Sequence, residues 1–154
     1  MKFELATHGP DATQRLAAHI GEIVQGPLAI LLCGDYGCGK TTFVQGLARG
    51  IGVSCVVRSP SYNIMKKYED GRLPLVHADL YRTAGHADIE ELGLVEETGQ
   101  GILAVEWPAA DLPELLGLPW VRIDFTGEDG EENLRRLTIS WEGEIPLVLG
   151  DLAQ

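Results

Sequence analysis

Basic residues are scarce in this chain: 12 lysines and arginines stand against 23 acidic residues, for a formal net charge of −11 at pH 7. Nucleic-acid phosphates bind basic surfaces, so this balance argues against a protein that binds RNA or DNA unaided. It leaves open a complex in which a partner supplies the positive charge. No stretch approaches the length of a membrane span, and the first residues include no apolar signal region. We therefore expect a cytoplasmic protein without membrane contact.

Cysteine is also scarce. Cys33, Cys38 and Cys55 make neither an even disulfide set nor a metal-ligand spacing, which favours the reducing cytosol. We expect Cys33 and Cys55 to act as small apolar side chains of the core. The rest of the composition is ordinary for a globular protein, with 45% apolar and 23% charged residues. A length of 154 residues predicts a single domain, residues 1–154, with one sizeable core.

A glycine-rich stretch at residues 34–41, GDYGCGKT, fits the pattern G-x-x-x-x-G-K-[ST] of phosphate-binding loops. Backbone N–H groups surround the phosphate oxygens in such a loop, so glycine is needed where side chains would intrude. Lys40 is expected to bind the β- and γ-phosphates, and the Thr41 hydroxyl to bind Mg²⁺.

The flanking sequence supports this interpretation over a chance glycine-rich turn. An apolar run at residues 28–33 predicts a buried parallel strand before the loop. Residues 42–49 predict a helix after it, with Gly50 as the stop. The N-terminus of that helix would then face the phosphates with its partial positive charge.

Two acids end predicted strands: Asp79 closes residues 73–79, and Glu106 follows the apolar run 101–105. In an open α/β sheet ligands bind outside the carboxyl ends of the strands, so both acids fit a site beside the loop if their strands are parallel to its strand. A triphosphatase needs Mg²⁺ and a group that orients water, and Glu106 is the stronger candidate. The alternatives are a surface acid for Glu106 and a helix N-cap or turn residue for Asp79. His77 is interpreted as a strand residue, since the sequence places no orienting acid beside it.

Together these patterns predict an α/β fold: a central parallel sheet, extended by antiparallel strands, with helices on both faces. The other predicted elements are a strand at 3–5, a helix from Pro10, a hairpin of 62–68 with 73–79 around an Asp-Gly turn, a helix-rich segment 86–98 broken at Gly93, and a hairpin of 121–125 with 137–141 around 127–133.

Five segments together resemble the TsaE (YjeE) ATPases of bacterial tRNA threonylcarbamoyladenosine synthesis. They are GDYGCGKTTF at 34–43, SPSY at 59–62, HADLYR at 77–82, ELGL at 91–94 and VEWP at 105–108. The resemblance covers most of the chain, and the last three segments are far more specific than the loop. It implies a P-loop NTPase fold and a small ATPase that works with the TsaB and TsaD proteins. TsaD transfers the threonylcarbamoyl group, the ATPase drives or resets the complex, and tRNA is reached only through that complex.

The resemblance also implies residue roles. ATP or ADP would be bound by Thr13, Asp35, Gly37, Cys38, Gly39, Lys40, Thr41 and Thr42, with Thr13 near the adenine. Mg²⁺ would be bound by Thr41, Glu106 and Asp79, and the catalytic residues would be Glu106, Asp79 and Lys40. Activity is expected to be low without partners.

The sequence departs from the family pattern at three positions of interest. Ser61 and Asn63 stand where threonine is frequent, and Cys38 replaces a usual alanine. The charge of Lys40 and the helix dipole predict a Cys38 pKa below that of a free cysteine. Whether the thiol faces the pocket or the core is left open by the sequence.

Two other classes compete with an ATPase. A small-molecule kinase would use the same ATP site, but it needs an arginine-bearing lid and an acceptor pocket, for which a chain of this length has little room. A GTP-dependent switch would carry the guanine-reading motif Asn-Lys-x-Asp, which the sequence lacks.

Overall fold

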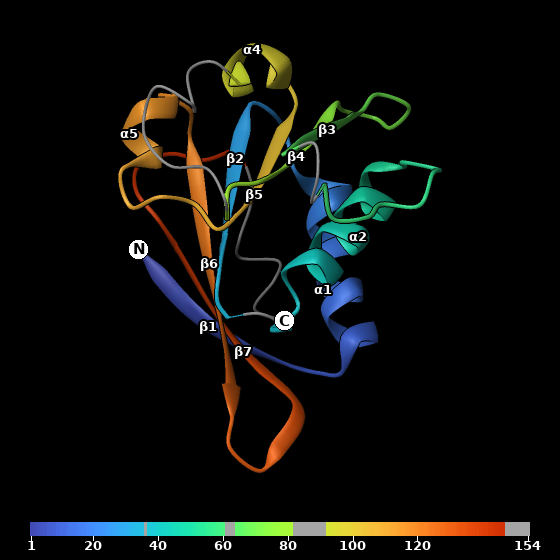
Figure 1. Ribbon diagram of the computed structural model, residues 1–154, viewed down its shortest axis with the longest axis vertical. Helices are drawn as coiled ribbons and strands as arrows, with labels where there is room; N and C mark the ends of the chain where they lie inside the picture. The colour runs from blue at the N-terminus through green and yellow to red at the C-terminus, as the bar shows by residue number, and fades with distance from the viewer. Residues whose placement is uncertain (36, 61–63, 82–91, 147–154) are drawn as a thin grey trace.

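The fold is a seven-stranded mixed sheet with helices on its two faces, seen in a computed structural model (Figure 1). The structure describes residues 1–35, 37–60, 64–81 and 92–146. The strands are β1 (Lys2–His8), β2 (Leu28–Cys33), β3 (Met65–Tyr68), β4 (Leu75–Asp79), β5 (Ile102–Glu106), β6 (Trp120–Glu128) and β7 (Glu131–Trp141). The helices are α1 (Pro10–Ile23), α2 (Lys40–Ile51), α4 (Leu94–Thr98) and α5 (Leu112–Leu116).

The strand order is β1-β7-β6-β2-β5-β4-β3. Four neighbouring strands, β6, β2, β5 and β4, are parallel, and antiparallel pairs extend them at both edges. This confirms the predicted central parallel sheet with antiparallel extensions. Strands β4 and β5 both run parallel to β2. Asp79 and Glu106, at the carboxyl ends of β4 and β5, therefore lie at the same edge of the sheet as the glycine-rich loop, as predicted.

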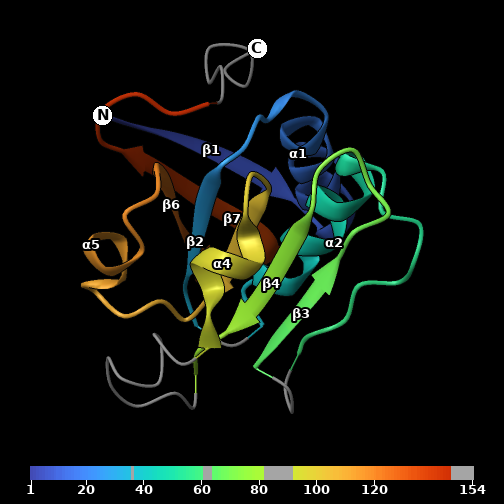
Figure 2. The same cartoon turned by 90° about the horizontal axis from the view of Figure 1, so that it is seen from above.

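Side-chain alternation along β2 explains why both faces of the sheet are covered. Leu28, Ile30 and Leu32 face a core that includes α1 and α2, whereas Ala29 and Leu31 face a second core that includes α4 and α5. Figure 2 shows the two groups of helices on opposite sides of the sheet. The predicted helices on both faces are therefore confirmed.

Glycine allows α1 and α2 to lie against each other. A Cβ atom at Gly50 would lie 2.0 Å from the Ala18 carbonyl oxygen, and one at Gly46 would lie 2.4 Å from that of Gln14. Gly50 therefore packs inside the helix pair, and its prediction as the stop of α2 was wrong. The helix continues to Ile51 and is capped by Gly52, whose φ of 97° is left-handed.

Both predicted hairpins exist, with boundaries that differ from the prediction. The turn placed at 127–133 is shorter, because β6 extends to Glu128 and β7 begins at Glu131. Strand β3 begins at Met65, and residues 62–63 of its predicted range lie outside the described residues. The same holds for 82–91, so the helix-rich prediction is tested only at its end, where α4 follows Gly93.

The predicted burial of two cysteines was only partly right. Cys33, at the end of β2, is half-buried, and Cys55, in the connector after α2, is exposed. Among the described residues, no helix has the length and apolar character needed to cross a membrane.

Candidate functional site

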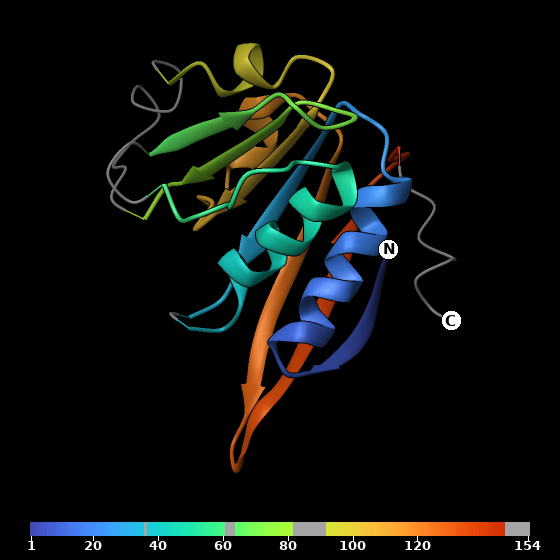
Figure 3. The ribbon, with the colours of Figure 1, turned by 90° about the vertical axis from the view of Figure 1, so that its right-hand side faces the viewer.

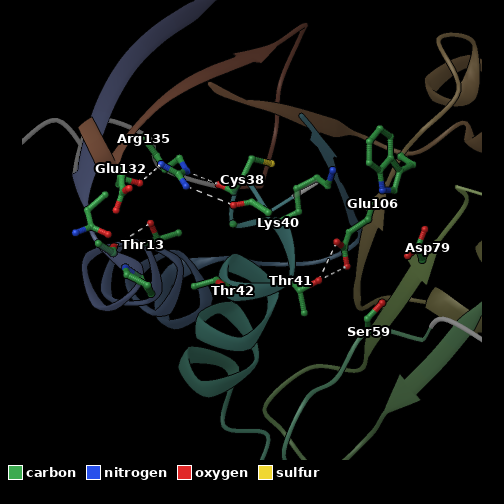
Figure 4. A pocket seen from close by; sticks show the side chains of 16 residues that line it. Thr13, Cys38, Lys40, Thr41, Thr42, Ser59, Asp79, Glu106, Glu132 and Arg135 are labelled. Carbon is green, nitrogen blue, oxygen red and sulfur yellow. Dashed lines mark hydrogen bonds between the residues drawn. The ribbon is translucent and has the colours of Figure 1, made fainter. Parts of the chain in front are cut away.

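A cavity of about 400 Å³ opens at the carboxyl end of the parallel strands. It is lined by the β1–α1 turn, the glycine-rich loop (residues 34–41), the connector at Ser59, the ends of β4 and β5, and the start of β7. Figure 4 shows Asp79, Glu106 and Thr41 on one side of it, with Thr13 and Arg135 on the other. Every predicted site residue lines this cavity except Asp35, which is exposed beside it.

The backbone of the glycine-rich loop requires glycine. Gly37 and Gly39 have φ values of 72° and 107°, which other residues rarely adopt. A Cβ atom at Gly34 would lie 2.7 Å from the Cys38 sulfur and 2.9 Å from the Phe125 carbonyl oxygen. The loop then passes directly into α2, whose first-turn N–H groups have no acceptor within the helix. Free N–H groups and a positive helix end form a favourable environment for an anion.

Lys40 is almost completely buried, and its amine binds the loop itself. Nζ donates to the carbonyl oxygen of Gly34 and, at 3.3 Å, to that of Asp35. The Trp107 ring covers it, with the centroid 3.5 Å from Nζ. Trp107 has a φ of 57°, an unfavourable value for a tryptophan. Its ring also contacts Tyr81, with centroids 5.0 Å apart.

Thr41 and Glu106 are joined across the cavity. The Thr41 hydroxyl lies 3.0 Å and 3.1 Å from the two carboxylate oxygens of Glu106, which is only 4% exposed. Asp79 is the direct ladder partner of Glu106 in the β4–β5 pair. The strand-end placement of both acids is therefore as predicted. Asp79 also forms the turn that was its predicted alternative, because its Oδ1 accepts the N–H of Tyr81, while residues 82–91, where a helix cap would act, lie outside the described residues. Glu106 is buried, so its surface-acid alternative was wrong.

His77 has a contact that the sequence interpretation missed. Its ring is fully buried, and Nε2 lies 2.6 Å from Oε2 of Glu106. The other ring nitrogen, Nδ1, has no hydrogen-bond partner among the described residues. A buried N–H without an acceptor is costly, so the neutral tautomer that carries its proton on Nε2 and donates to Glu106 is favoured. His77 and Asp79 are two residues apart on β4, so their side chains lie on the same face of the sheet. Asp79 pairs with Glu106, and this spacing was therefore the signal that His77 also lies on the face of Glu106.

Oxygen atoms dominate this end of the cavity, and Mg²⁺ prefers oxygen ligands. Thr41, Glu106 and Asp79 are the residues that fit such an ion. Within the described ranges, no group of three or more histidine, cysteine, aspartate or glutamate side chains is placed to hold a metal ion by itself. Mg²⁺ needs no such group, because it usually keeps several waters and binds one or two carboxylates together with phosphate oxygens.

The opposite end of the cavity is formed by α1 and β7. Thr13 is buried, and its hydroxyl lies 2.8 Å from that of Thr7. Arg135, which sequence reasoning did not select, donates through Nε to the Cys38 carbonyl oxygen at 3.2 Å and through Nη2 to that of Gly37 at 3.4 Å. The signal for Arg135 was its alternation with Leu137 and Ile139, which places it on the core face of β7.

The Cys38 thiol turns beneath the loop and is only 7% exposed. Burial raises the pKa of this thiol and outweighs the charge of Lys40 and the backbone hydrogen bonds that favour the thiolate. The expected lowered pKa was therefore wrong, and the core-facing alternative is the observed one. The departures at Ser61 and Asn63 lie outside the described residues, as do Arg82 and Glu91 of the resemblance.

Comparison with known proteins identifies the family. Residues 7–137 match the family model described as "Threonylcarbamoyl adenosine biosynthesis protein TsaE". The tRNA threonylcarbamoyladenosine biosynthesis protein TsaE of Bacillus subtilis is 42% identical over 66% of this chain and 63% of its own length, so the match spans less than two thirds of that relative. The proteins of the same name from Aquifex aeolicus and Streptomyces coelicolor are 38% and 32% identical, over 71% and 85% of this chain and 80% and 91% of their own lengths.

A solved structure agrees with the sequence matches. The crystal structure of Bacillus subtilis YdiB superposes with a TM-score of 0.68 at 33% identity, covering 93% of this chain and 87% of that one. The family model covers most of the chain and includes the loop, both strand-end acids, His77 and Arg135. This chain belongs to the TsaE family.

Proposed function

We propose that this chain is an ATPase with a P-loop NTPase fold, which binds ATP with Mg²⁺ and hydrolyses it in support of tRNA threonylcarbamoyladenosine biosynthesis. The observation that carries the proposal is the pairing of Thr41, in the first turn of α2, with the buried carboxylate of Glu106. A threonine hydroxyl and a strand-end carboxylate beside a glycine-rich loop are the groups that Mg²⁺ and a triphosphate need.

In this proposal the phosphates of ATP or ADP bind the N–H groups of the loop, and Lys40 exchanges its carbonyl contacts for phosphate oxygens. Charged acceptors make stronger hydrogen bonds than carbonyls, so the exchange is favourable. Thr41 and Glu106, with Asp79 beside them, hold Mg²⁺, which neutralises developing phosphate charge. Glu106 also orients or deprotonates the attacking water. The nucleoside extends toward Thr13.

The names of the relatives support the pathway, since they are called tRNA threonylcarbamoyladenosine biosynthesis proteins. We propose TsaB- and TsaD-like proteins as partners and contact with tRNA only through them. The net charge of −11 supports an indirect contact. Tyr81 is half-exposed and contacts Trp107 at the cavity, which supports a partner surface at the metal-binding end.

The test is phosphate release from Mg²⁺–ATP by the purified chain, with and without TsaB and TsaD, and with EDTA as the control. We expect slow release by the chain alone, acceleration by the partners and no release in EDTA. Release without any added acceptor also separates an ATPase from a small-molecule kinase. Absence of both nucleotide binding and hydrolysis, even with the partners, would contradict the proposal.

A second measurement addresses tRNA. The isolated chain is expected to bind tRNA weakly or not at all, because its acidic surface repels phosphates. Filter binding at several salt concentrations checks this. Tight binding that weakens steeply with salt would show a direct tRNA contact instead.

A further inference from the structure

We propose that Arg135 of β7 positions the glycine-rich loop for phosphate binding by holding two carbonyl groups at the tip of the loop. This inference rests on the proposed function and deepens it, since it adds a residue from the antiparallel edge of the sheet to the phosphate site. Arg135 acts through the loop, so it is a positioning residue.

The contacts of Arg135 are specific to the loop tip. Nε and Nη2 donate to the carbonyl oxygens of Cys38 and Gly37, as Figure 4 shows, while Nη1 donates to the carbonyls of Glu132 and Leu134 in its own strand. The guanidinium group therefore ties the loop tip to β7. Its planar fork suits two neighbouring acceptors in a way that a lysine amine does not.

The neighbours of Arg135 in the sheet are small side chains. Arg135 pairs in register with Thr7 of β1 and with Gly127 of β6. A Cβ atom at Gly127 would lie 3.8 Å from Nη1, an ordinary van der Waals distance, so the guanidinium lies over this position without crowding. The hairpin of β6 and β7 extends past the glycine-rich loop in Figure 3. The hydrogen bonds of Arg135 to Gly37 and Cys38 show that its side chain reaches the loop from this hairpin.

The effect on phosphate binding follows from the direction of the peptide groups. Carbonyl and N–H groups of a peptide point in opposite directions, so fixing the carbonyls of Gly37 and Cys38 toward β7 turns the following N–H groups the other way. Gly37 and Gly39 have positive φ values and carry no side chain to restrict them. Arg135 and Lys40 hold different carbonyls, at the tip and at the start of the loop, so Arg135 can remain in place when Lys40 turns to a phosphate.

The adjacent arginine provides a matched control. Arg136 points to the other face of β7, is exposed and forms an ion pair with Glu128. A surface ion pair of this kind contributes little. Arg135→Ala and Arg136→Ala thus remove the same side chain from neighbouring positions, and only the first loses contact with the loop.

The experiment measures dissociation constants of ADP, Mg²⁺–ATP and inorganic tripolyphosphate for wild type, Arg135→Ala, Arg135→Lys and Arg136→Ala. Loss of two hydrogen bonds made by a charged group predicts roughly tenfold weaker binding of all three probes to Arg135→Ala. Arg135→Lys should recover only part of the loss, and Arg136→Ala should match wild type. Amide NMR shifts of Cys38 and Gly39, whose N–H groups share peptide planes with the two held carbonyls, should change without ligand in Arg135→Ala and not in Arg136→Ala.

Three results would overturn the inference: equal affinities in the two alanine variants, a loss for ADP and ATP without a loss for tripolyphosphate, or loop amide shifts that Arg135→Ala leaves unchanged. The second result would place Arg135 on the nucleoside. If Arg135→Ala does not fold, Arg135→Lys is the deciding variant, and wild-type affinity for tripolyphosphate would then contradict the inference. Wild-type protein that binds none of the probes would contradict the proposed function itself.

Discussion

The two ends of the cavity are built in different ways. At the end proposed to bind Mg²⁺, His77 and Glu106 are buried and in contact across the neighbouring parallel strands β4 and β5. At the far end the cavity wall includes Glu132 and Asn133, which are exposed at the start of an antiparallel hairpin. Figure 1 shows that hairpin projecting beyond the other strands.

This difference suggests that the two ends of the cavity contribute to different steps, one to hydrolysis and the other to binding. Buried polar groups with fixed partners need no rearrangement before a reaction, and this is the property that stabilises developing charge. Exposed groups on a hairpin contribute to affinity and position instead. Substitutions of Glu106 and its contact His77 should therefore change hydrolysis, whereas substitutions of the loop residue Lys40 or of residues toward the far end should change binding or nothing. The predictions below test this division, from the largest expected effect to the smallest.

Glu106→Gln should lower the turnover number for ATP by roughly 10²–10⁴-fold, the usual contribution of a group that handles the proton of the attacking water. ATP affinity should fall much less, because the main loss occurs in the transition state. Steady-state phosphate release and nucleotide titration check this, with the exposed Glu96→Gln as control. An unchanged turnover number would mean that the buried carboxylate of Glu106 has no part in hydrolysis.

Lys40→Ala should weaken ATP binding by roughly 10–100-fold, since it removes hydrogen bonds from a charged donor to phosphate. The free protein should melt near the wild-type temperature, because the contacts of Nζ within the described residues are to loop carbonyls and the Trp107 ring. Isothermal titration and thermal melting measure the two effects. Unchanged ATP affinity would refute the phosphate-site assignment.

His77→Leu should lower hydrolysis by roughly 10–100-fold and raise the Mg²⁺ concentration that is needed for it, as loss of a partner to a metal-binding carboxylate usually does. His77→Gln should retain more activity, because its side-chain amide can replace the Nε2–H donor. Rates are measured across a Mg²⁺ titration. Equal losses in the two variants, with no change in Mg²⁺ dependence, would mean that His77 only fills space.

Cys38 should react with iodoacetamide more slowly than Cys55 at neutral pH. Burial raises the pKa of Cys38, so less of it is thiolate at a given pH, while Cys55 is exposed. Mass spectrometry of the labelled peptides with and without Mg²⁺–ATP measures both rates. Faster labelling of Cys38 that nucleotide suppresses would show that the thiol faces the cavity and acts as a gate.

Local patterns in the sequence were sufficient to predict the strand, loop and helix around Lys40 and the position of the two acids at strand ends. Each of these depends on residues close together in the chain: an apolar run followed by glycine, or an apolar run followed by an acid. The family resemblance then supplied the expected role of Thr13, which such patterns do not carry.

What the sequence interpretation missed depends on which strands are neighbours. His77 meets Glu106 only because β4 and β5 are adjacent, and Arg135 reaches Gly37 only because β7 runs past the loop. The pKa of Cys38 was predicted from nearby charges, and burial, which is a property of the packed loop, outweighed them. Gly50 resembled a helix stop because the close contact with α1 is not visible in a local pattern.

The most direct test of the account is a crystal structure of the chain with Mg²⁺ and a slowly hydrolysed ATP analogue. We expect the β- and γ-phosphates on the N–H groups of residues 37–41, Mg²⁺ bound to Thr41 near Glu106 and Asp79, and the adenine toward Thr13. A nucleotide bound with its base at Glu106, or bound outside this cavity, would contradict the account.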